Sequence, residues 1–159
     1  MCGAHLAESV RKKASKALRE QLFLPKGEHT TILVAISGGK DSAVLLERIH
    51  ENLGKRRDVT IVGGCVDEGI DGYRPPSLEC ARELCEELGI RFETVSYPEL
   101  GFKEMDEVVD KIVQLEERKA PCSYCGVFRR QGINHLANRV NADVIALGHN
   151  LDDMAQTIM

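Results

Sequence analysis

The sequence lacks the long apolar run that a membrane-spanning helix requires. No stretch approaches the roughly eighteen uninterrupted apolar residues of such a helix, and the N-terminus carries charges where a signal peptide has its apolar region. These absences predict a cytoplasmic protein that does not use a membrane as partner. With 159 residues, 43% of them hydrophobic, the chain is long enough for one compact domain.

An excess of positive charge is also missing. The net charge is −4 at pH 7, whereas a dedicated nucleic-acid-binding domain is usually clearly basic. Basic residues do cluster in three places, which are residues 11–19, Lys55 to Arg57, and Arg129 with Arg130. A solvated charged face is a sufficient explanation for the first two clusters. The third follows directly on a pair of cysteines and is harder to dismiss.

Cysteines are too few for a disulfide scaffold. The chain has six, and in a reducing cytosol burial, metal binding or catalysis are their commoner uses. We interpret Cys65, Cys80 and Cys85 as small hydrophobes without chemistry, because one ends a predicted strand and the others lie on an apolar helix. Cys2, Cys122 and Cys125 are left as candidates for chemistry.

Four short apolar or β-branched runs alternate with helical patterns. The predicted strands are residues 31–36, 59–62, 91–95 and 143–147, after an amphipathic lead-in helix over residues 6–20. Such alternation predicts an α/β fold with a doubly wound parallel sheet covered on both faces. Ligands of these sheets bind beyond the carboxyl ends of the strands. The segments predicted at that edge are residues 37–42, 67–76, 97–102 and 148–153.

A glycine loop follows the first predicted strand. It comprises Ser37, Gly38, Gly39, Lys40, Asp41 and Ser42, and it opens a helix. Glycines let backbone N–H groups approach phosphate oxygens, and hydroxyls with a lysine add further donors. The spacing is neither that of a Walker A loop nor that of a G-x-G-x-x-G dinucleotide loop. A tight turn capped by Asp41 or Ser42 would need only one polar residue, so the motif favours a phosphate site.

A second polar segment ends the fourth predicted strand. It reads Gly148-His149-Asn150-Leu151-Asp152-Asp153. Two adjacent carboxylates at a helix start can hold Mg²⁺ or position ATP. The alternative is helix capping favoured by the helix dipole.

The cysteine pair lies in the run P-C-S-Y-C-G-V-F-R-R-Q, which begins at Pro121 and opens a helix. A C-x-x-C at a helix start places both sulfurs on one face and fits zinc, an iron–sulfur cluster or a dithiol redox pair. A merely structural pair is the alternative. Arg129 is a weaker candidate for substrate or phosphate contact.

Taken together, S-G-G-K-D-S, the cysteine run and G-H-N-L-D-D-M-A-Q-T resemble the tRNA 2-thiolation enzymes. These are PP-loop proteins of the N-type ATP pyrophosphatases, and the motifs are most similar to the archaeal and eukaryotic branch that thiolates the wobble uridine. The resemblance implies a sheet of order 3-2-1-4 and cleavage of ATP to AMP and pyrophosphate. It implies nucleotide contacts at residues 37–42, Asp67, Gly148, His149, Asp152 and Asp153, with Mg²⁺ and ATP near Asp153.

The resemblance also implies the reaction, which is ATP-dependent replacement of O2 of a tRNA uridine by sulfur. Cys122 and Cys125 would take two ligand places of a 4Fe–4S cluster, and the third ligand would lie beyond residue 159. Cys122, Cys125 and Asp153 are the expected catalytic residues. The implied partners are tRNA, a sulfide or sulfur-carrier donor, and a second copy or related subunit. Thiolation of a T-loop uridine or an anticodon-loop cytidine, and a non-catalytic ATP- and tRNA-binding subunit, remain alternatives.

The first residues resemble half of a zinc ribbon. Members of the family open with C-x-x-C followed by C-x-x-H, and Cys2-Gly3-Ala4-His5 matches only the second part. Structural zinc takes four ligands, so Cys2 and His5 are expected to be a remnant, with an unstructured terminus as the alternative. We therefore expect a fragment of a longer protein, with residues 1–29 as ribbon remnant and lead-in helix and residues 30–159 as a truncated catalytic domain.

Overall fold

The computed structural model describes residues 2–25, 27–114, 121–149 and 153. Its centre is a four-stranded sheet of order β3-β2-β1-β4 in which every neighbouring pair is parallel. The predicted fold class and strand order are therefore confirmed. The strands are β1 (Thr30–Ala35), β2 (Val59–Asp67), β3 (Arg91–Ser96) and β4 (Val144–Ala146).

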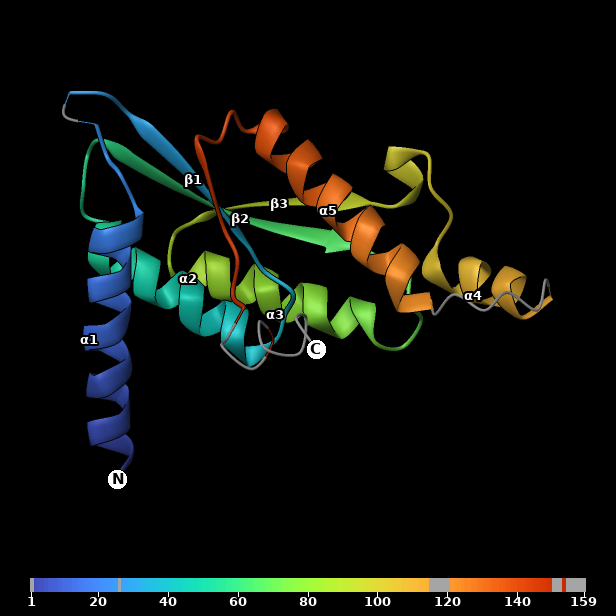
Figure 1. Ribbon diagram of the computed structural model, residues 1–159, viewed down its shortest axis with the longest axis horizontal. Helices are drawn as coiled ribbons and strands as arrows, with labels where there is room; N and C mark the ends of the chain where they lie inside the picture. Colours follow the sequence, from blue (N-terminus) through green and yellow to red (C-terminus); the bar gives the residue numbers. More distant parts are fainter. Residues whose placement is uncertain (1, 26, 115–120, 150–152, 154–159) are drawn as a thin grey trace.

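Helices cover both faces of the sheet (Figure 1). Two of them, α2 and α3, lie on one face, and α5 crosses the other with α4 beside it. The helices are α1 (Gly3–Gln21), α2 (Lys40–Leu53), α3 (Arg74–Glu87), α4 (Met105–Gln114) and α5 (Pro121–Arg139), with a 3-10 turn at Pro98–Leu100. None of the helices among the described residues is long and apolar enough to cross a membrane.

The hydrophobic core forms two layers, one on each face of the sheet. Along β1, Ile32 and Val34 pack toward α2 and α3, while Leu33 packs toward α5. This alternation follows from the two-residue period of a strand, and burial on both faces is usual for the central strands of parallel sheets. It explains why β1 reads as a continuous apolar run.

Strand β2 is longer than the sequence pattern predicted, because it continues from residue 62 to Asp67. The pattern is interrupted by Gly63 and Gly64, and glycine is a poor strand former. Both glycines stand where the packing has no room for a side chain. A Cβ at Gly63 would lie 2.5 Å from Cys85 Sγ, and one at Gly64 would lie 2.7 Å from Leu33 Cδ1.

The cysteines outside the pair differ in burial. Cys65 on β2 and Cys85 on α3 are fully buried, as the sequence interpretation expected. Burial raises the pKa of each of these thiols to about 11. The interpretation of Cys80 as a buried small hydrophobe is wrong, because this residue lies on the solvent side of α3 and is exposed.

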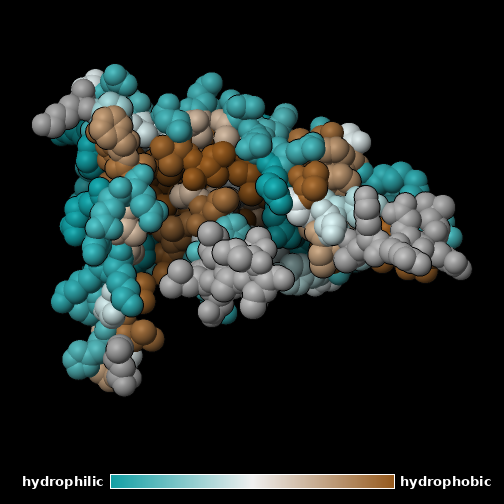
Figure 2. All heavy atoms as spheres, in the orientation of Figure 1, coloured by the Kyte–Doolittle hydropathy of each residue, from teal (hydrophilic) through white to brown (hydrophobic). Residues whose placement is uncertain are grey.

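Helix α1 projects from the body of the molecule (Figure 1) and buries none of its residues completely. It is joined to α2 by an ion pair of 2.9 Å between Arg11 and Glu51 and by a hydrogen bond from Ser15 to Asn52. An apolar groove of about 310 Å³ lies between α1, α2 and β4. Figure 2 shows hydrophobic atoms gathered on this face of the molecule.

Candidate functional site

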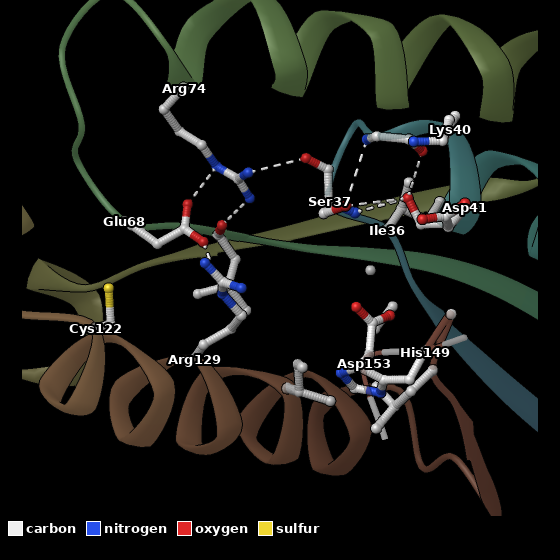
Figure 3. Close-up of a pocket in the computed structure, with 18 residues that line it drawn as sticks. Ile36, Ser37, Lys40, Asp41, Glu68, Arg74, Cys122, Arg129, His149 and Asp153 are labelled. Atoms are coloured by element: carbon white, nitrogen blue, oxygen red, sulfur yellow. Dashed lines mark hydrogen bonds and ion pairs between the residues drawn. The ribbon is translucent and has the colours of Figure 1, made fainter. Parts of the chain in front are cut away.

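A cavity of about 1010 Å³ lies at the carboxyl ends of β1, β2 and β4, the edge of the sheet that the sequence predicted. Its size is at the upper end for ligand pockets, so it has room for a nucleotide and part of a second substrate. Two walls face each other across it (Figure 3). The loop wall is formed by residues 37–42 with Arg74 of α3, and the cysteine wall by Cys122, Arg129 and Ile133 of α5. Glu68 lies between the two walls, and residues 147–149 with Asp153 complete the lining.

The loop of residues 37–42 is held by short-range hydrogen bonds. Ser42 Oγ donates to the Gly39 carbonyl at 2.9 Å and accepts from the Ser37 N–H at 3.2 Å. Gly38 has φ +83°, and a Cβ there would lie 2.3 Å from the Ser77 carbonyl on α3. Position 38 is therefore restricted to glycine both by its backbone conformation and by its neighbour.

Helix α2 begins at Lys40 and directs its N-terminus at the cavity. Its N-cap residue is Gly39, which has no side chain to cap the first N–H groups. Uncapped N–H groups and the positive end of the helix dipole favour an anion such as phosphate. Lys40 adds a positive charge at the same place. The arrangement is that of a phosphate-binding loop.

The segment after β4 reaches the same place. Gly148 approaches the first turn of α2 so closely that a Cβ would lie 3.2 Å from the Ser42 nitrogen. His149 and Asp153 also line the cavity, with Asp153 near the loop in Figure 3. A carboxylate beside a phosphate loop is suited to a Mg²⁺ ion that accompanies a nucleotide. Asp152 lies outside the described residues.

Not every predicted residue lines the cavity. Gly38 shapes the loop from behind, and Asp67 accepts a hydrogen bond from the Gly69 N–H at 3.0 Å instead of facing the cavity. Cys2 and His5 lie at the free end of α1, away from α5 (Figure 1). Their Sγ and Nδ1 atoms are 3.1 Å apart.

The cysteine pair opens α5, as predicted. Cys122 is exposed and lines the cavity, whereas Cys125 is partly buried behind it. The hydroxyl of Tyr97 donates to the Cys125 carbonyl at 3.1 Å and lies 3.4 Å from Cys125 Sγ. Burial and the contact with Cys125 raise the pKa of Tyr97, so the hydroxyl stays protonated.

An aromatic cluster supports this end of α5. Tyr97 makes edge contacts with both phenylalanines, at centroid distances of 6.4 Å to Phe102 and 5.5 Å to Phe128. The Phe102 and Phe128 rings are stacked at 4.3 Å. Contacts of this kind stabilise the packing beyond simple area burial. They fix the first turns of α5 against the segment after β3.

Glu68 and Arg74 both line the cavity, although neither was predicted as a site residue from the sequence. Each has a relative exposure of 3%, and charged residues are rarely so buried unless they are paired. They lie in the segment 67–76 that the topology placed at the ligand edge. That position was the available signal, because neither residue belongs to a motif.

The two thiols fit part of a metal or cluster site. Residues at spacing i and i+3 share one face of a helix, and Cys122 and Cys125 have this spacing on α5. Within residues 2–25, 27–114, 121–149 and 153, no group of three or more His, Cys, Asp or Glu side chains is placed to hold a metal ion. A complete site therefore needs at least one ligand from elsewhere.

Comparison with known proteins identifies the domain. The PP-loop domain family matches residues 6–159. The tRNA 2-thiolation protein NcsA of Haloferax volcanii is 38% identical over 163 aligned residues, covering 100% of this chain and 50% of that protein. Cytoplasmic tRNA 2-thiolation protein 1 of Anopheles gambiae is 40% identical, covering 89% of this chain and 40% of that protein. The chain thus spans half or less of the length of these relatives.

Solved structures agree with the sequence relatives. The U34-tRNA thiolase NcsA from Methanococcus maripaludis, solved with its [4Fe-4S] cluster, superimposes with a TM-score of 0.81 at 33% identity, over 99% of this chain and 50% of that one. An NH3-dependent NAD synthetase from Campylobacter jejuni shares the fold, with a TM-score of 0.56 at 16% identity, over 97% and 59%. The chain belongs to the PP-loop domain family, in the branch of the tRNA 2-thiolation proteins.

Proposed function

We propose that the protein is an ATP-dependent tRNA 2-thiolation enzyme that acts on the wobble uridine. One observation carries this proposal: the phosphate loop and Cys122 line the same cavity. ATP bound at the loop and a sulfur atom handled at Cys122 would therefore meet the same substrate. The relatives named above are tRNA 2-thiolation proteins, and one is a U34-tRNA thiolase.

Activation of the base is the task of the loop wall. The uracil O2 attacks the α-phosphorus of ATP, an O–P bond forms, and pyrophosphate leaves. The α2 N-terminus and Lys40 stabilise the negative charge of the phosphates. Asp153, with Asp41 on the loop wall, would hold a Mg²⁺ ion, which when bound would supply positive charge to offset the negative charge of the phosphates. The product is an adenylated base whose C2–O bond is ready to break.

Sulfur transfer is the task of the cysteine wall. A sulfide-level sulfur nucleophile attacks C2, the C2–S bond forms, and AMP leaves with the former O2. Overall, uridine, ATP and hydrosulfide give 2-thiouridine, AMP and pyrophosphate without oxidation or reduction. Cys122 and Cys125 would be two ligands of the cluster, which when bound supplies an iron that can carry the sulfur. Tyr97 holds Cys125 in place, and the stacked phenylalanines support the same end of α5.

Several finer predictions belong to this proposal. Mg²⁺ at Asp153 and Asp152, the adenine contact at Asp67, the zinc remnant at Cys2 and His5, and the domain boundary at residues 29 and 30 follow from the family resemblance. The expected partners besides tRNA are a sulfur donor, which is sulfide or a sulfur-carrier protein, and a second copy of the chain or a related subunit. The expected compartment is the cytoplasm, in line with the names of the eukaryotic relatives.

Anaerobic reconstitution tests the proposal. The intact protein, loaded with iron and sulfide, is incubated with ATP, Mg²⁺, sulfide and tRNA. The expected products are AMP and 2-thiouridine, and nuclease mapping is expected to place the modified base at the wobble position. Mapping to the T-loop or to a cytidine would replace the proposed substrate with one of the alternatives. Absence of both tRNA-dependent AMP and thiouridine would identify a binding subunit instead.

Two variants separate the half-reactions. Asp41→Ala is expected to lose tRNA-dependent AMP formation, because Asp41 lies on the loop wall. Cys122→Ala is expected to keep ATP binding and lose thiouridine. Thiolation at the wild-type rate in either variant would contradict the role given to that residue.

A further inference from the structure

Glu68 joins the two walls of the cavity. Its carboxylate has a relative exposure of 3% and lies between two guanidinium groups, Arg74 on α3 and Arg129 on α5 (Figure 3). Arg74 Nε is 2.8 Å from Glu68 Oε2, and Arg129 Nε is 2.9 Å from Glu68 Oε1. A single buried carboxylate is thus shared by two helices that come from opposite faces of the sheet.

On the loop side, Arg74 is as buried as Glu68 and donates to both backbone and side-chain atoms, among them Cys65 Sγ at 2.9 Å and Ser77 Oγ at 3.4 Å. Arg74 donates to the carbonyl of Ser37, the first residue of the phosphate loop, at 3.1 Å. It also donates to the Val66 carbonyl. Its Nε and Glu68 Oε2 form an ion pair without hydrogen-bond alignment, and neither atom has another hydrogen-bond partner among the described residues. Arg74 therefore depends on the Glu68 charge.

On the cysteine side, the Arg129 side chain is half exposed and is therefore less confined by packing than the Arg74 side chain. Its Nε donates to Glu68 at 2.9 Å, and its Nη2 lies 3.6 Å from Cys125 Sγ. Burial alone lowers the pKa of Arg129, but the Glu68 carboxylate and the nearby Cys125 and Tyr97 outweigh it, and the net shift is upward. Glu68 is the partner that holds this guanidinium beside the sulfur.

Two other carboxylates line the cavity that Arg129 lines. Asp41 on the loop wall and Asp153 line the same cavity (Figure 3), so an arginine side chain released from Glu68 has other carboxylates to pair with. Pairing there would remove Arg129 from Cys125 and occupy carboxylates that the proposed reaction assigns to magnesium and ATP.

We propose that Glu68 is a positioning residue that fixes Arg129 against Cys125 and Arg74 against the phosphate loop. Glu68 thereby fixes the loop wall and the cysteine wall relative to each other. The benefit for catalysis rests on the proposed thiolation function. The positioning itself does not, because it concerns contacts within this chain.

A double-mutant cycle on Cys125 reactivity tests the positioning directly. The metal-free protein is treated with iodoacetamide, and alkylation of each cysteine is followed by peptide mass spectrometry. Glu68→Gln and Arg129→Gln are each expected to change the Cys125 rate by about threefold or more, and the double variant by no more than either single variant. If the fold-changes of the two single variants multiply in the double variant, or if the Cys125 alkylation rate is unchanged in Glu68→Gln, the proposal is overturned.

The other cysteines and a matched ion pair serve as controls. Glu99 pairs with Arg139 at the far end of α5, so Glu99→Gln is expected to leave Cys125 unchanged. Cys65 and Cys85 are fully buried, and their alkylation reports unfolding.

Removing one partner of a buried ion pair is strongly destabilising. If Glu68→Gln exposes these thiols, Glu68→Asp replaces it, because aspartate keeps the charge beside Arg74 but is too short to hold both arginines.

Thiolation assays separate the two proposals. At saturating ATP, Glu68→Gln and Arg129→Gln are expected to lower the thiolation rate by about tenfold or more, again without additivity. If the wild-type protein makes no thiouridine while the alkylation rates of the variants are non-additive, the proposed function alone is overturned. Normal thiolation with additive alkylation would overturn the positioning role alone.

Discussion

The two walls of the cavity are built in different ways. In the phosphate loop, most of the hydrogen bonds join residues at most five positions apart, as between Ser37 and Ser42, and Arg74 adds one bond to the Ser37 carbonyl from 37 positions away. At the cysteine wall, Cys125 is held by Tyr97, 28 positions away, and Arg129 by Glu68, 61 positions away. A contiguous motif can therefore specify the first wall, whereas the second depends on the packing of α5 against the rest of the domain.

The largest expected effect comes from removing chemistry from the cysteine wall alone. Cys122→Ser is expected to lower tRNA thiolation by about 1000-fold or more, since it removes a thiolate ligand of the cluster that would carry the transferred sulfur. ATP affinity, measured by equilibrium binding, is expected to stay unchanged because the loop wall is intact. Cys80→Ser, an exposed cysteine on α3 outside the cavity, is the control and should be active.

The loop wall is expected to fail when its glycine is lost. In Gly38→Ala, the Cβ meets the Ser77 carbonyl and the alanine must keep φ near +83°. A loop displaced by about 1 Å should weaken ATP binding by about 100-fold. Gly72→Ala is the matched control, because Gly72 has φ +71° but nothing within 4 Å. Equal ATP affinity in the two variants would contradict the steric argument.

A smaller effect is expected where α5 crosses β2. A Cβ at Gly132 would lie 2.8 Å from Val66 Cγ1, so Gly132→Ala should lower the free energy of unfolding by about 1–3 kcal/mol and displace α5. Gly126→Ala on the same helix meets nothing within 4 Å and should raise helix stability by about 0.5–1 kcal/mol. Denaturant unfolding measures both changes, and a destabilised Gly126→Ala would weaken the comparison.

The smallest expected effect is at the support of the cysteine wall. Tyr97→Phe removes the hydroxyl that contacts Cys125 and should lower the free energy of unfolding by about 1 kcal/mol. ATP affinity should not change, because Tyr97 lies behind the cysteine wall. Tyr73→Phe is the control, since Tyr73 is 62% exposed. Loss of ATP affinity in Tyr97→Phe would show that the two walls are less separate than their contacts indicate.

The sequence by itself determined the fold and the loop wall. Alternating apolar runs and helical patterns specified a parallel sheet, and S-G-G-K-D-S after the first strand specified a glycine loop at the ligand-binding edge of that sheet, because both depend on local geometry. It also placed Cys122 and Cys125 at a helix start. These features were predictable because residues close in the chain interact through fixed helical and strand periods.

Only the tertiary structure decided the rest of the site. The extension of β2 through Gly63 and Gly64 was hidden by their poor strand propensity, and close packing against Cys85 and Leu33 explains it. Glu68 and Arg74 belong to no motif, and their role follows from mutual burial at the cavity. Cys80 was misjudged because helical periodicity does not reveal which face of α3 meets the sheet. A buried ion pair, or a close contact between a glycine and a side chain, joins residues that are distant in the chain, so local sequence patterns do not predict it.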